Sequence, residues 1–405
     1  MTSPAVADSQ VFAARNAVYA VFTANGVAFA SWASRIPDAK AGLGLSAGEL
    51  GIVLLFTSAG SLLGLPLAGR IAERFGAARA CTGALLVMAV GLSLVGIGAD
   101  AVSNRWVVAA GLFLLGLGMG VCDVGMNLEG ATVERPLGRS IMPRFHAAFS
   151  GGTVLAALFG AGTAALAVPI WLHLAGVALL LAAAAVVATR PFLPRELDTT
   201  GEPQDAAANG IPQAHRSAWT EPRTLLIGLV TLVAAFTEGT ANDWVSVAFV
   251  EGHDLPSWAG VLAFATFLGF MTLGRLLGTG LLDRYGRVRV LRISFVVALG
   301  GSLLVVFGSA PLAFVGAALW GMGVSLGFPV GMSAAADDPA RANARVSVVA
   351  TIGYLAFIAG PPLIGFLGDA YGVLRALLAV GVLILGAYAA LPAVREPRPA
   401  ALRTD

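Results

Sequence analysis

Long apolar runs of about 20 residues alternate with short polar segments along most of the chain, which is the length a helix needs to cross a bilayer. Ser46-Ala47-Gly48-Glu49, just before the second run, is typical of a capping box that opens a helix. The pattern predicts an all-α polytopic membrane protein with twelve transmembrane helices. The predicted spans lie near 15–35, 47–69, 79–98, 105–128, 143–167, 169–189, 223–249, 257–281, 288–308, 311–334, 344–367 and 371–393.

Composition supports lipid as the solvent, because 57% of the 405 residues are hydrophobic and only 12% are charged. The net charge of +2 is too small to indicate a nucleic-acid partner. Cys81 and Cys122 lie in apolar runs and the four histidines are scattered, so we expect neither a disulfide nor a metal site. No cofactor is indicated. The start of the chain lacks the pattern of a cleavable signal, so we expect its first span to be retained.

Residues 190–222 break the apolar pattern with several prolines and acidic residues. This composition predicts a flexible linker. We therefore expect a six-helix bundle at 1–189, a cytoplasmic linker at 190–222, and a second six-helix bundle at 223–405.

Basic residues concentrate on the cytoplasmic side of membrane proteins. With the N-terminus inside and twelve spans, 21 of the 25 lysine and arginine residues fall in inner segments. Only Arg35, Lys40, Arg105 and Arg375 fall outside. The asymmetry predicts that both termini are cytoplasmic and favours an even number of spans.

The two halves echo one another at an offset of just over 200 residues. Phe22-Thr23-Ala24-Asn25-Gly26 matches Phe236-Thr237-Glu238-Gly239 with one gap, and Gly118-Met119-Gly120-Val121 matches Gly321-Met322-Gly323-Val324. Such parallel repeats are typical of transporters whose substrate lies between two halves.

Gly69-Arg70-Ile71-Ala72-Glu73-Arg74-Phe75-Gly76 resembles the loop signature of the major facilitator superfamily, with Glu73 in place of the usual aspartate. The second half keeps Asp283, Arg284 and Gly286 but has Thr279 where a glycine is expected. The resemblance implies a cytoplasmic gating loop built from Gly69, Glu73, Arg74, Gly76 and their counterparts. The alternative is that these charges simply terminate helices.

A narrower resemblance rests on Trp32-Ala33-Ser34-Arg35-Ile36-Pro37-Asp38, Asp123-Val124-Gly125-Met126-Asn127 and Asn242-Asp243-Trp244. These segments are similar to the branch of the superfamily that contains the rhizopine-locus membrane protein and is related to the fucose permeases. The similarity implies a small polar substrate such as a sugar or polyol.

Apart from Glu49 in the capping box, three acidic residues fall within predicted spans, where an ionisable group is costly unless it faces a cavity or a partner. Asp123 shares a helix face with Gly116, Gly120, Asn127 and Gly130, and the matching segment of the second half contains no acid. Glu238 lies near the middle of the seventh span, and Asp243 lies nearer its outer end. These three, with His146, are our candidates for proton coupling. The alternative is a structural hydrogen bond or ion pair for Asp123, an interfacial residue capped by water for Asp243, and a hydrogen bond at a helix end for His146.

Amide and aromatic side chains near these acids are candidates for contact with a hydroxyl-rich substrate. We expect Asn25 and Glu238 to face the cavity in the first and seventh spans. The tryptophans could instead be interfacial anchors, and Arg35 could hold an anion or extend to the outer interface. The substrate-binding candidates are Asn25, Trp32, Arg35, Asn127, Asn242, Trp244 and Trp320.

The pattern favours a proton-coupled secondary transporter of the bacterial inner membrane that works as a monomer by alternating access. A drug or metabolite efflux antiporter of the same fold is the alternative, although residues 147–167 lack the glycine-proline signature of such pumps. A membrane enzyme or a receptor without transport is disfavoured, because the sequence offers no nucleophile motif, clustered metal ligands or phosphate-binding loop.

Overall fold

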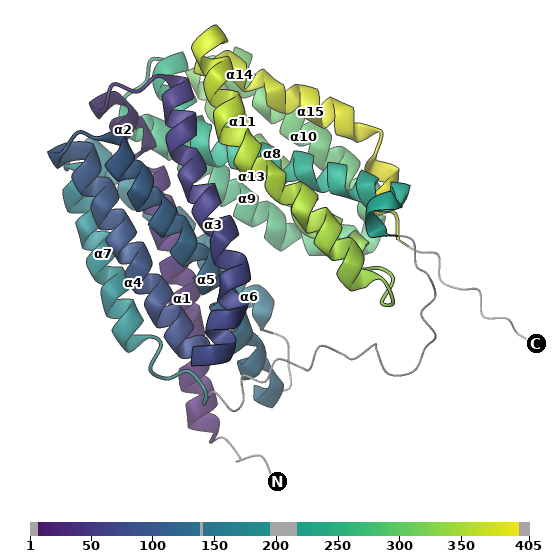
Figure 1. The fold of residues 1–405 in the computed structure, drawn as a ribbon. Helices are drawn as coiled ribbons and strands as arrows, with labels where there is room; N and C mark the ends of the chain where they lie inside the picture. Colours follow the sequence, from purple (N-terminus) through teal and green to yellow (C-terminus); the bar gives the residue numbers. More distant parts are fainter. Residues whose placement is uncertain (1–6, 138–140, 195–216, 397–405) are drawn as a thin grey trace, which may run out of the picture. The chain divides into compact units, whose positions relative to one another are not determined.

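The computed structural model describes residues 7–137, 141–194 and 217–396, which form helices and connecting turns (Figure 1). The first half contains α1 (Asp8–Ala33), α2 (Ile36–Gly42), α3 (Ala47–Phe75), α4 (Ala77–Gly96), the π-helical turn η1 (Ile97–Ala101), α5 (Arg105–Leu137), α6 (Met142–Ala165) and α7 (Ile170–Val187). The second half contains η3 (Ala218–Thr220), α8 (Pro222–Gly252), α9 (Ser257–Tyr285), α10 (Arg287–Phe307), α11 (Ala310–Val324), α12 (Gly327–Ala335), α13 (Ala342–Tyr371), α14 (Val373–Ala376), α15 (Leu378–Tyr388) and η4 (Leu391–Val394).

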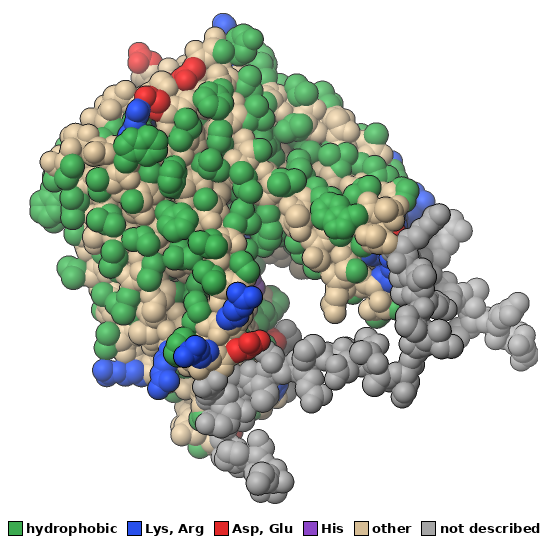
Figure 2. Space-filling model, viewed as in Figure 1, with side chains coloured by type: hydrophobic (Ala, Val, Ile, Leu, Met, Phe, Trp, Pro, Cys, Tyr) green, Lys and Arg blue, Asp and Glu red, His purple; other side chains and the backbone are tan. Residues whose placement is uncertain are grey.

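Ten of the twelve predicted spans are helices that are long and apolar enough to cross a membrane, among the residues that the structure describes. The first span is α1, whose apolar pattern is diluted by polar residues. The last span is divided between α14 and α15, and its two pieces form an apolar stretch over Val373–Tyr388. The chain is thus an all-α polytopic membrane protein of twelve transmembrane helices. Hydrophobic side chains cover most of the visible sides of the helices, while lysine and arginine gather near helix ends (Figure 2).

The chain divides into two compact units. Unit 1 comprises Met1–Ile211 and Ser246–Ala265, so it includes α1 to α7 and the connected ends of α8 and α9. Unit 2 comprises Pro212–Val245 and Thr266–Asp405. Most of the predicted linker, residues 195–216, lies outside the described residues.

Glycines let α5 pack closely against two neighbours within unit 1. A Cβ atom on Gly116 would lie 1.9 Å from the carbonyl oxygen of Thr57 in α3, and one on Gly118 would lie 2.7 Å from that of Ala84 in α4. Any larger residue would therefore push these helices apart. The small residues let α5 lie directly against both α3 and α4, as expected where membrane helices pack through their backbones.

The same contacts recur in unit 2, but in a register that differs from the predicted match. Gly321 meets the carbonyl of Phe267 in α9, and Gly323 meets that of Ser294 in α10. Because α9 and α10 are the counterparts of α3 and α4, Gly321 corresponds to Gly116 rather than Gly118. The predicted alignment of this pair of motifs was wrong by two residues, since a glycine-rich helix offers several equally good matches in sequence.

The capping box that the sequence predicts is present at the start of α3. The Ser46 hydroxyl accepts a hydrogen bond from the backbone N–H of Glu49 at 3.2 Å, and a Glu49 carboxylate oxygen accepts one from Ser46 N–H at 3.0 Å. Both bonds satisfy donors that the first helical turn leaves unpaired.

Charged side chains tie helix ends together at the end of unit 2 where α8, α10 and α13 begin; we call it the basic end. Asp337 accepts hydrogen bonds from Arg223 at 2.8 Å and from Arg287 at 2.7 Å. Beside them, Glu221 pairs with Arg341 and Arg345. These contacts join the start of α8, which precedes α9 in the sequence, to segments that follow α9, and they fix the helix ends next to one another.

Candidate functional site

Asp123 and Asn127 form the polar face of α5 that the sequence predicts. The Asn127 amide donates to the Asp123 carboxylate at 3.3 Å and to the Asp123 carbonyl at 2.8 Å, and the Asp123 side chain is exposed. No arginine or lysine of the described residues pairs with Asp123, although its carboxylate interacts electrostatically with His146 of α6. An open carboxylate within a span is thus left with an amide and an imidazole as its polar neighbours.

The glycines predicted to share that face serve packing instead. Gly116 and Gly120 meet the backbone of α3, and Gly130 meets Met142 and Phe145 of α6. Only the two polar side chains remain open, so the face combines close packing at its edges with a polar centre at Asp123 and Asn127.

Asn25 of α1 lies in the same unit and is buried. Its amide nitrogen lies 3.8 Å from the sulfur of Met126 in α5, and its amide oxygen is buried without a hydrogen-bond partner among the described residues. A buried amide oxygen without a hydrogen-bond partner is unfavourable. Exchanging the positions of the amide oxygen and nitrogen would not help, because two N–H donors would then lack a partner at the same place. Asn25 is therefore a polar group that a ligand or water could satisfy.

Glu238 of α8 is ion-paired within unit 2. One guanidinium nitrogen of Arg275, from α9, lies 3.0 Å from both carboxylate oxygens. The guanidinium also donates to the carbonyl oxygen of Ser325 at 3.4 Å, at the break between α11 and α12. Pro329 explains that free carbonyl, because proline has no N–H to donate to the residue four positions earlier.

The other polar residues of α8 lack such partners. The Asn242 amide oxygen is buried with no hydrogen bond from the described residues. The Asp243 carboxylate has no hydrogen bond or ion pair within the same part of the chain. The middle of α8 thus carries one neutralised acid and, within two turns, an amide oxygen and a carboxylate that have no hydrogen-bond partner among the described residues.

The predicted tryptophans lie inside the helical packing. Trp244 and Trp320 have no exposed surface, and Trp32 is almost fully buried. Trp320 meets Phe267 edge-on, with ring centroids 6.1 Å apart. An interfacial anchor has to reach the lipid headgroups, so burial does not fit that interpretation of Trp32 and Trp244. A role in substrate binding stays a prediction for all three.

Arg35 is also buried, with an exposed fraction of 2%. Its guanidinium donates to Asp38 at 2.7 Å, to the carbonyl oxygen of Val168 at 2.6 Å and to His173 at 3.0 Å. Neither the proposed extension to the outer interface nor an open anion site fits this geometry. Arg35 instead joins the segment after α1 to the start of α7 within unit 1.

The two predicted gating loops share one backbone geometry. Gly76 has φ 82° and ψ 161°, and Gly286 has φ 76° and ψ 158°; each ends one long helix and caps the next. Arg74 and Arg284 lie over the rings that follow them, Phe75 and Tyr285. A role in gating remains a prediction.

The departures from the loop signature have a simple structural reason. A Cβ on Gly69 would meet nothing within 4 Å, so a larger residue such as Thr279 fits the equivalent position of the second half. Glu73 and Asp283 are both exposed next to the capping glycines.

Sequence reasoning missed a half-buried base within a span, Arg275, and a buried acid, Glu129. Arg275 was assigned to an inner segment although it falls inside the predicted eighth span, and a base within a span is itself a signal for a paired acid. Glu129 of α5, which has no exposed surface, accepts a hydrogen bond from the backbone N–H of Leu193 at 2.7 Å. It ties α5 to the segment that follows α7.

Twelve spans in two related halves, with polar groups in the middle of spans, define a membrane transporter. The profile of the Major Facilitator Superfamily matches residues 12–347 and, in an overlapping second match, 254–404. The chain belongs to this superfamily.

Relatives of similar length support this assignment. An uncharacterized transporter of Sinorhizobium fredii is 30% identical over 94% of this chain and 96% of its own length. An uncharacterized transporter of the superfamily from Yersinia pestis is 32% identical over 91% and 92%, and the membrane protein MosC of Rhizobium meliloti is 28% identical over 90% and 86%. The predicted resemblance to the rhizopine-locus branch is confirmed.

Solved structures agree on the fold. A bacterial homologue of the human lysosomal transporter Spinster has a TM-score of 0.79 at 15% identity, covering 98% of this chain and all of that one. The nucleoside transporter NupG has a TM-score of 0.76 at 14% identity, with coverage of 94% and 98%. A point mutant of the fucose–proton symporter FucP of E. coli has a TM-score of 0.59 at 15% identity, with coverage of 94% and 98%.

Proposed function

We propose that this transporter carries a small polar solute, of the sugar or polyol class, by alternating access coupled to protons. The observation that carries the proposal is the set of mid-span polar groups with unused hydrogen-bonding capacity, Asn25 in unit 1 and Asn242 in unit 2. Amides both donate and accept, so they suit a ligand rich in hydroxyl groups. The solved structures of a nucleoside transporter and a fucose–proton symporter share this fold, which is consistent with such a substrate.

Proton coupling needs a carboxyl group whose charge changes during the cycle. Glu238 is the weaker candidate, because Arg275 already neutralises it. Asp123 and Asp243 have no arginine or lysine partner among the described residues. Protonation of either carboxylate would neutralise an unpaired charge within the span, which lowers the cost of moving that residue as the transporter reorients. We therefore assign coupling to Asp123 or Asp243, and substrate contact to Asn25, Asn127, Asn242 and the Glu238–Arg275 pair.

A ligand screen followed by flux measurements tests the proposal. Ligands that bind only the folded protein raise its melting temperature, so a panel of sugars, polyols and nucleosides should include compounds that stabilise it. In proteoliposomes, a pH gradient should drive accumulation of such a compound. If Asp123 carries the proton, Asp123→Asn should abolish gradient-driven accumulation but retain exchange; if Asp243 carries it, Asp243→Asn should do so instead. Asp8→Asn, at the exposed start of α1, should change neither accumulation nor exchange. Gradient-driven uptake by Asp123→Asn at the wild-type level would exclude Asp123.

Efflux of drugs or metabolites is the second candidate function. The prolines within long helices favour it little: α6 carries only Pro143 at its start, whereas Pro361 and Pro362 lie inside α13. Proton-dependent export of a cationic dye from everted vesicles, with no response to any polyhydroxylated compound, would replace our proposal with this one.

We also propose that the protein lies in the bacterial inner membrane with both termini in the cytoplasm. The asymmetry of basic residues supports this orientation. Cysteines introduced at Asp8 and at Asn104, which lie on opposite sides of the membrane in this topology, test the orientation. Labelling of Asp8→Cys by an impermeant reagent in intact cells would show that the N-terminus lies outside.

A further inference from the structure

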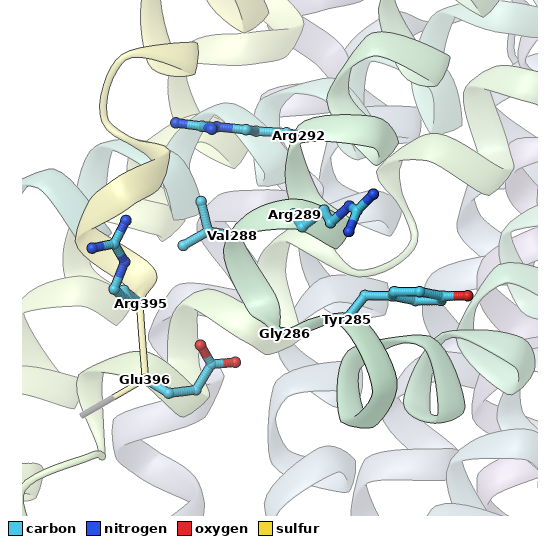
Figure 3. Close-up of a pocket in the computed structure, with 7 residues that line it drawn as sticks. All are labelled: Tyr285, Gly286, Val288, Arg289, Arg292, Arg395 and Glu396. Atoms are coloured by element: carbon cyan, nitrogen blue, oxygen red, sulfur yellow. The ribbon is translucent and has the colours of Figure 1, made fainter. Parts of the chain in front are cut away.

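A pocket opens at the basic end of unit 2, between the start of α10 and the segment that follows η4. It has a volume of about 460 Å³ and is lined by Tyr285, Gly286, Val288, Arg289, Arg292, Arg395 and Glu396. In Figure 3, Arg292 and Arg395 extend from these two elements on one side of Val288, and Arg289 lies toward Tyr285 on the other. Three arginine side chains therefore line one pocket.

The positive charge of this pocket is not neutralised within the part of the chain that the structure describes. The guanidinium groups of Arg289, Arg292 and Arg395 make no ion pair with any described acid, and Arg289 lies over the Tyr285 ring, 5.7 Å from its centroid. The single acid of the pocket, Glu396, is already engaged, since it accepts a hydrogen bond from the backbone N–H of Arg287 at 2.7 Å. The pocket thus carries an excess of positive charge that would attract an anion.

The helix that carries two of the arginines indicates where that anion comes from. Along α10, exposed residues recur at 289, 292, 293, 296, 300, 303 and 307, which fall within about 100° of the helix circumference. Ile293, Val296, Leu303 and Phe307 make this stripe apolar. Arg289 lies about 27 Å from Phe307 along the axis, close to the thickness of the hydrocarbon core of a bilayer. Arg289 and Arg292 therefore lie at one end of an apolar stripe that faces lipid, at the depth expected for lipid phosphates.

The first half lacks the equivalent feature. With Gly76 matched to Gly286, Arg79 corresponds to Arg289, but Thr82 stands in place of Arg292. Thr82 bonds to Thr189 at 2.7 Å and to the carbonyl of Ala78. The duplicated fold therefore does not require a base at position 292.

We propose that this pocket binds the phosphate of an anionic phospholipid, with the acyl chains along the stripe of α10. Basic pockets beside membrane helices attract acidic headgroups, and each basic residue near the surface contributes roughly a fivefold gain in affinity. The ligand is held by the charges of Arg292, Arg395 and Arg289, and its glycerol fits beside Val288.

The full-length protein in mild detergent, with phosphatidylglycerol added, tests the site by native mass spectrometry. Retention of phosphatidylglycerol should fall at least fivefold in Arg292→Gln/Arg395→Gln relative to wild type, whereas retention of phosphatidylethanolamine should not change. Arg79→Gln, the exposed counterpart in unit 1, should behave as wild type. Glycerol 3-phosphate and inorganic phosphate, at equal concentration, should not displace the lipid.

Three results would overturn the proposal. Wild-type retention in the double variant would exclude the pocket, and an equal loss in Arg79→Gln would attribute binding to general surface charge. Displacement by glycerol 3-phosphate or inorganic phosphate would identify a free phosphate as the ligand. If the double variant does not fold, Arg292→Gln and Arg395→Gln are measured singly, and unchanged lipid retention in both would likewise exclude the pocket as the lipid site.

Discussion

Glu238 and Arg275 form an ion pair that joins α8 to α9, with one guanidinium nitrogen 3.0 Å from both carboxylate oxygens. The pair brings together a mid-span acid and a mid-span base. Each would be costly alone in a low-dielectric environment, and together they cancel most of that cost.

Removal of one partner should therefore destabilise the protein more than removal of both. We expect Glu238→Gln or Arg275→Gln to cost roughly 1–3 kcal/mol, because each leaves a partly buried charge unpaired. The double substitution Glu238→Gln/Arg275→Gln should recover most of that loss. Melting temperatures in detergent, read as a double-mutant cycle, measure the coupling, and additive losses would show that the pair contributes nothing.

Substitution of Arg35 should weaken unit 1 without any effect that depends on substrate. Arg35→Lys keeps the charge but cannot reach His173, Asp38 and Val168 together, so we expect a loss of roughly 2–4 kcal/mol. Arg105→Lys alters an exposed pair with Glu49 and a contact with the Trp106 ring, and it should cost less than about 1 kcal/mol. Equal melting temperatures for the two variants would contradict the structural role of Arg35.

The capping glycines should be sensitive to a single methyl group, whereas Gly69 should not. Gly76→Ala and Gly286→Ala place a side chain at φ near +80° and ψ near 160°, a backbone region that is essentially restricted to glycine, at a cost of roughly 1–3 kcal/mol each. Gly69→Ala lies in a helix with free space around it and should be neutral or stabilising by up to about 1 kcal/mol. Thermal unfolding separates the two groups. A loss at Gly69 as large as that at Gly76 would show that the loop, and not the backbone angle, sets the requirement.

The basic end of unit 2 should weaken in acid through Glu221. Partial burial raises the pKa of this carboxyl group, but hydrogen bonds from Thr224 and Arg345 and the charges of Arg345 and Arg341 outweigh it, so the pKa lies below its ordinary value of 4.5. A lowered carboxyl pKa stabilises the fold above about pH 4.5. That contribution is lost as the pH falls through the lower pKa of the folded state.

The difference in melting temperature between wild type and Glu221→Gln should accordingly be constant from pH 7 to about pH 5 and shrink below it. Asp8→Asn, at an exposed helix start, serves as the control and should show no such trend. A difference that grows on acidification would reverse the assignment.

The sequence determined the transmembrane architecture because lipid leaves few choices. A chain whose apolar runs match the bilayer thickness has to satisfy its backbone within helices, so the predicted spans and the cap at Ser46 could be read from spacing alone. The repeats could be read as well, through Gly76 and Gly286. Their register in the glycine-rich helices could not, because only the contacts of Gly116 and Gly321 distinguish matches that are equivalent in sequence.

What the tertiary structure decided is which polar groups have partners. The sequence by itself singled out Asp123, Glu238 and Arg35 as costly residues in or near spans, but not that Arg275 neutralises Glu238 or that His173 and Asp38 hold Arg35. Those partners lie between 3 and 138 positions away along the chain, and hydrogen bonds of this range depend on how helices pack. The periodicity of a helix determines the face on which a side chain lies. Only the packing of helices against one another brings a second charged group to about 3 Å from that side chain.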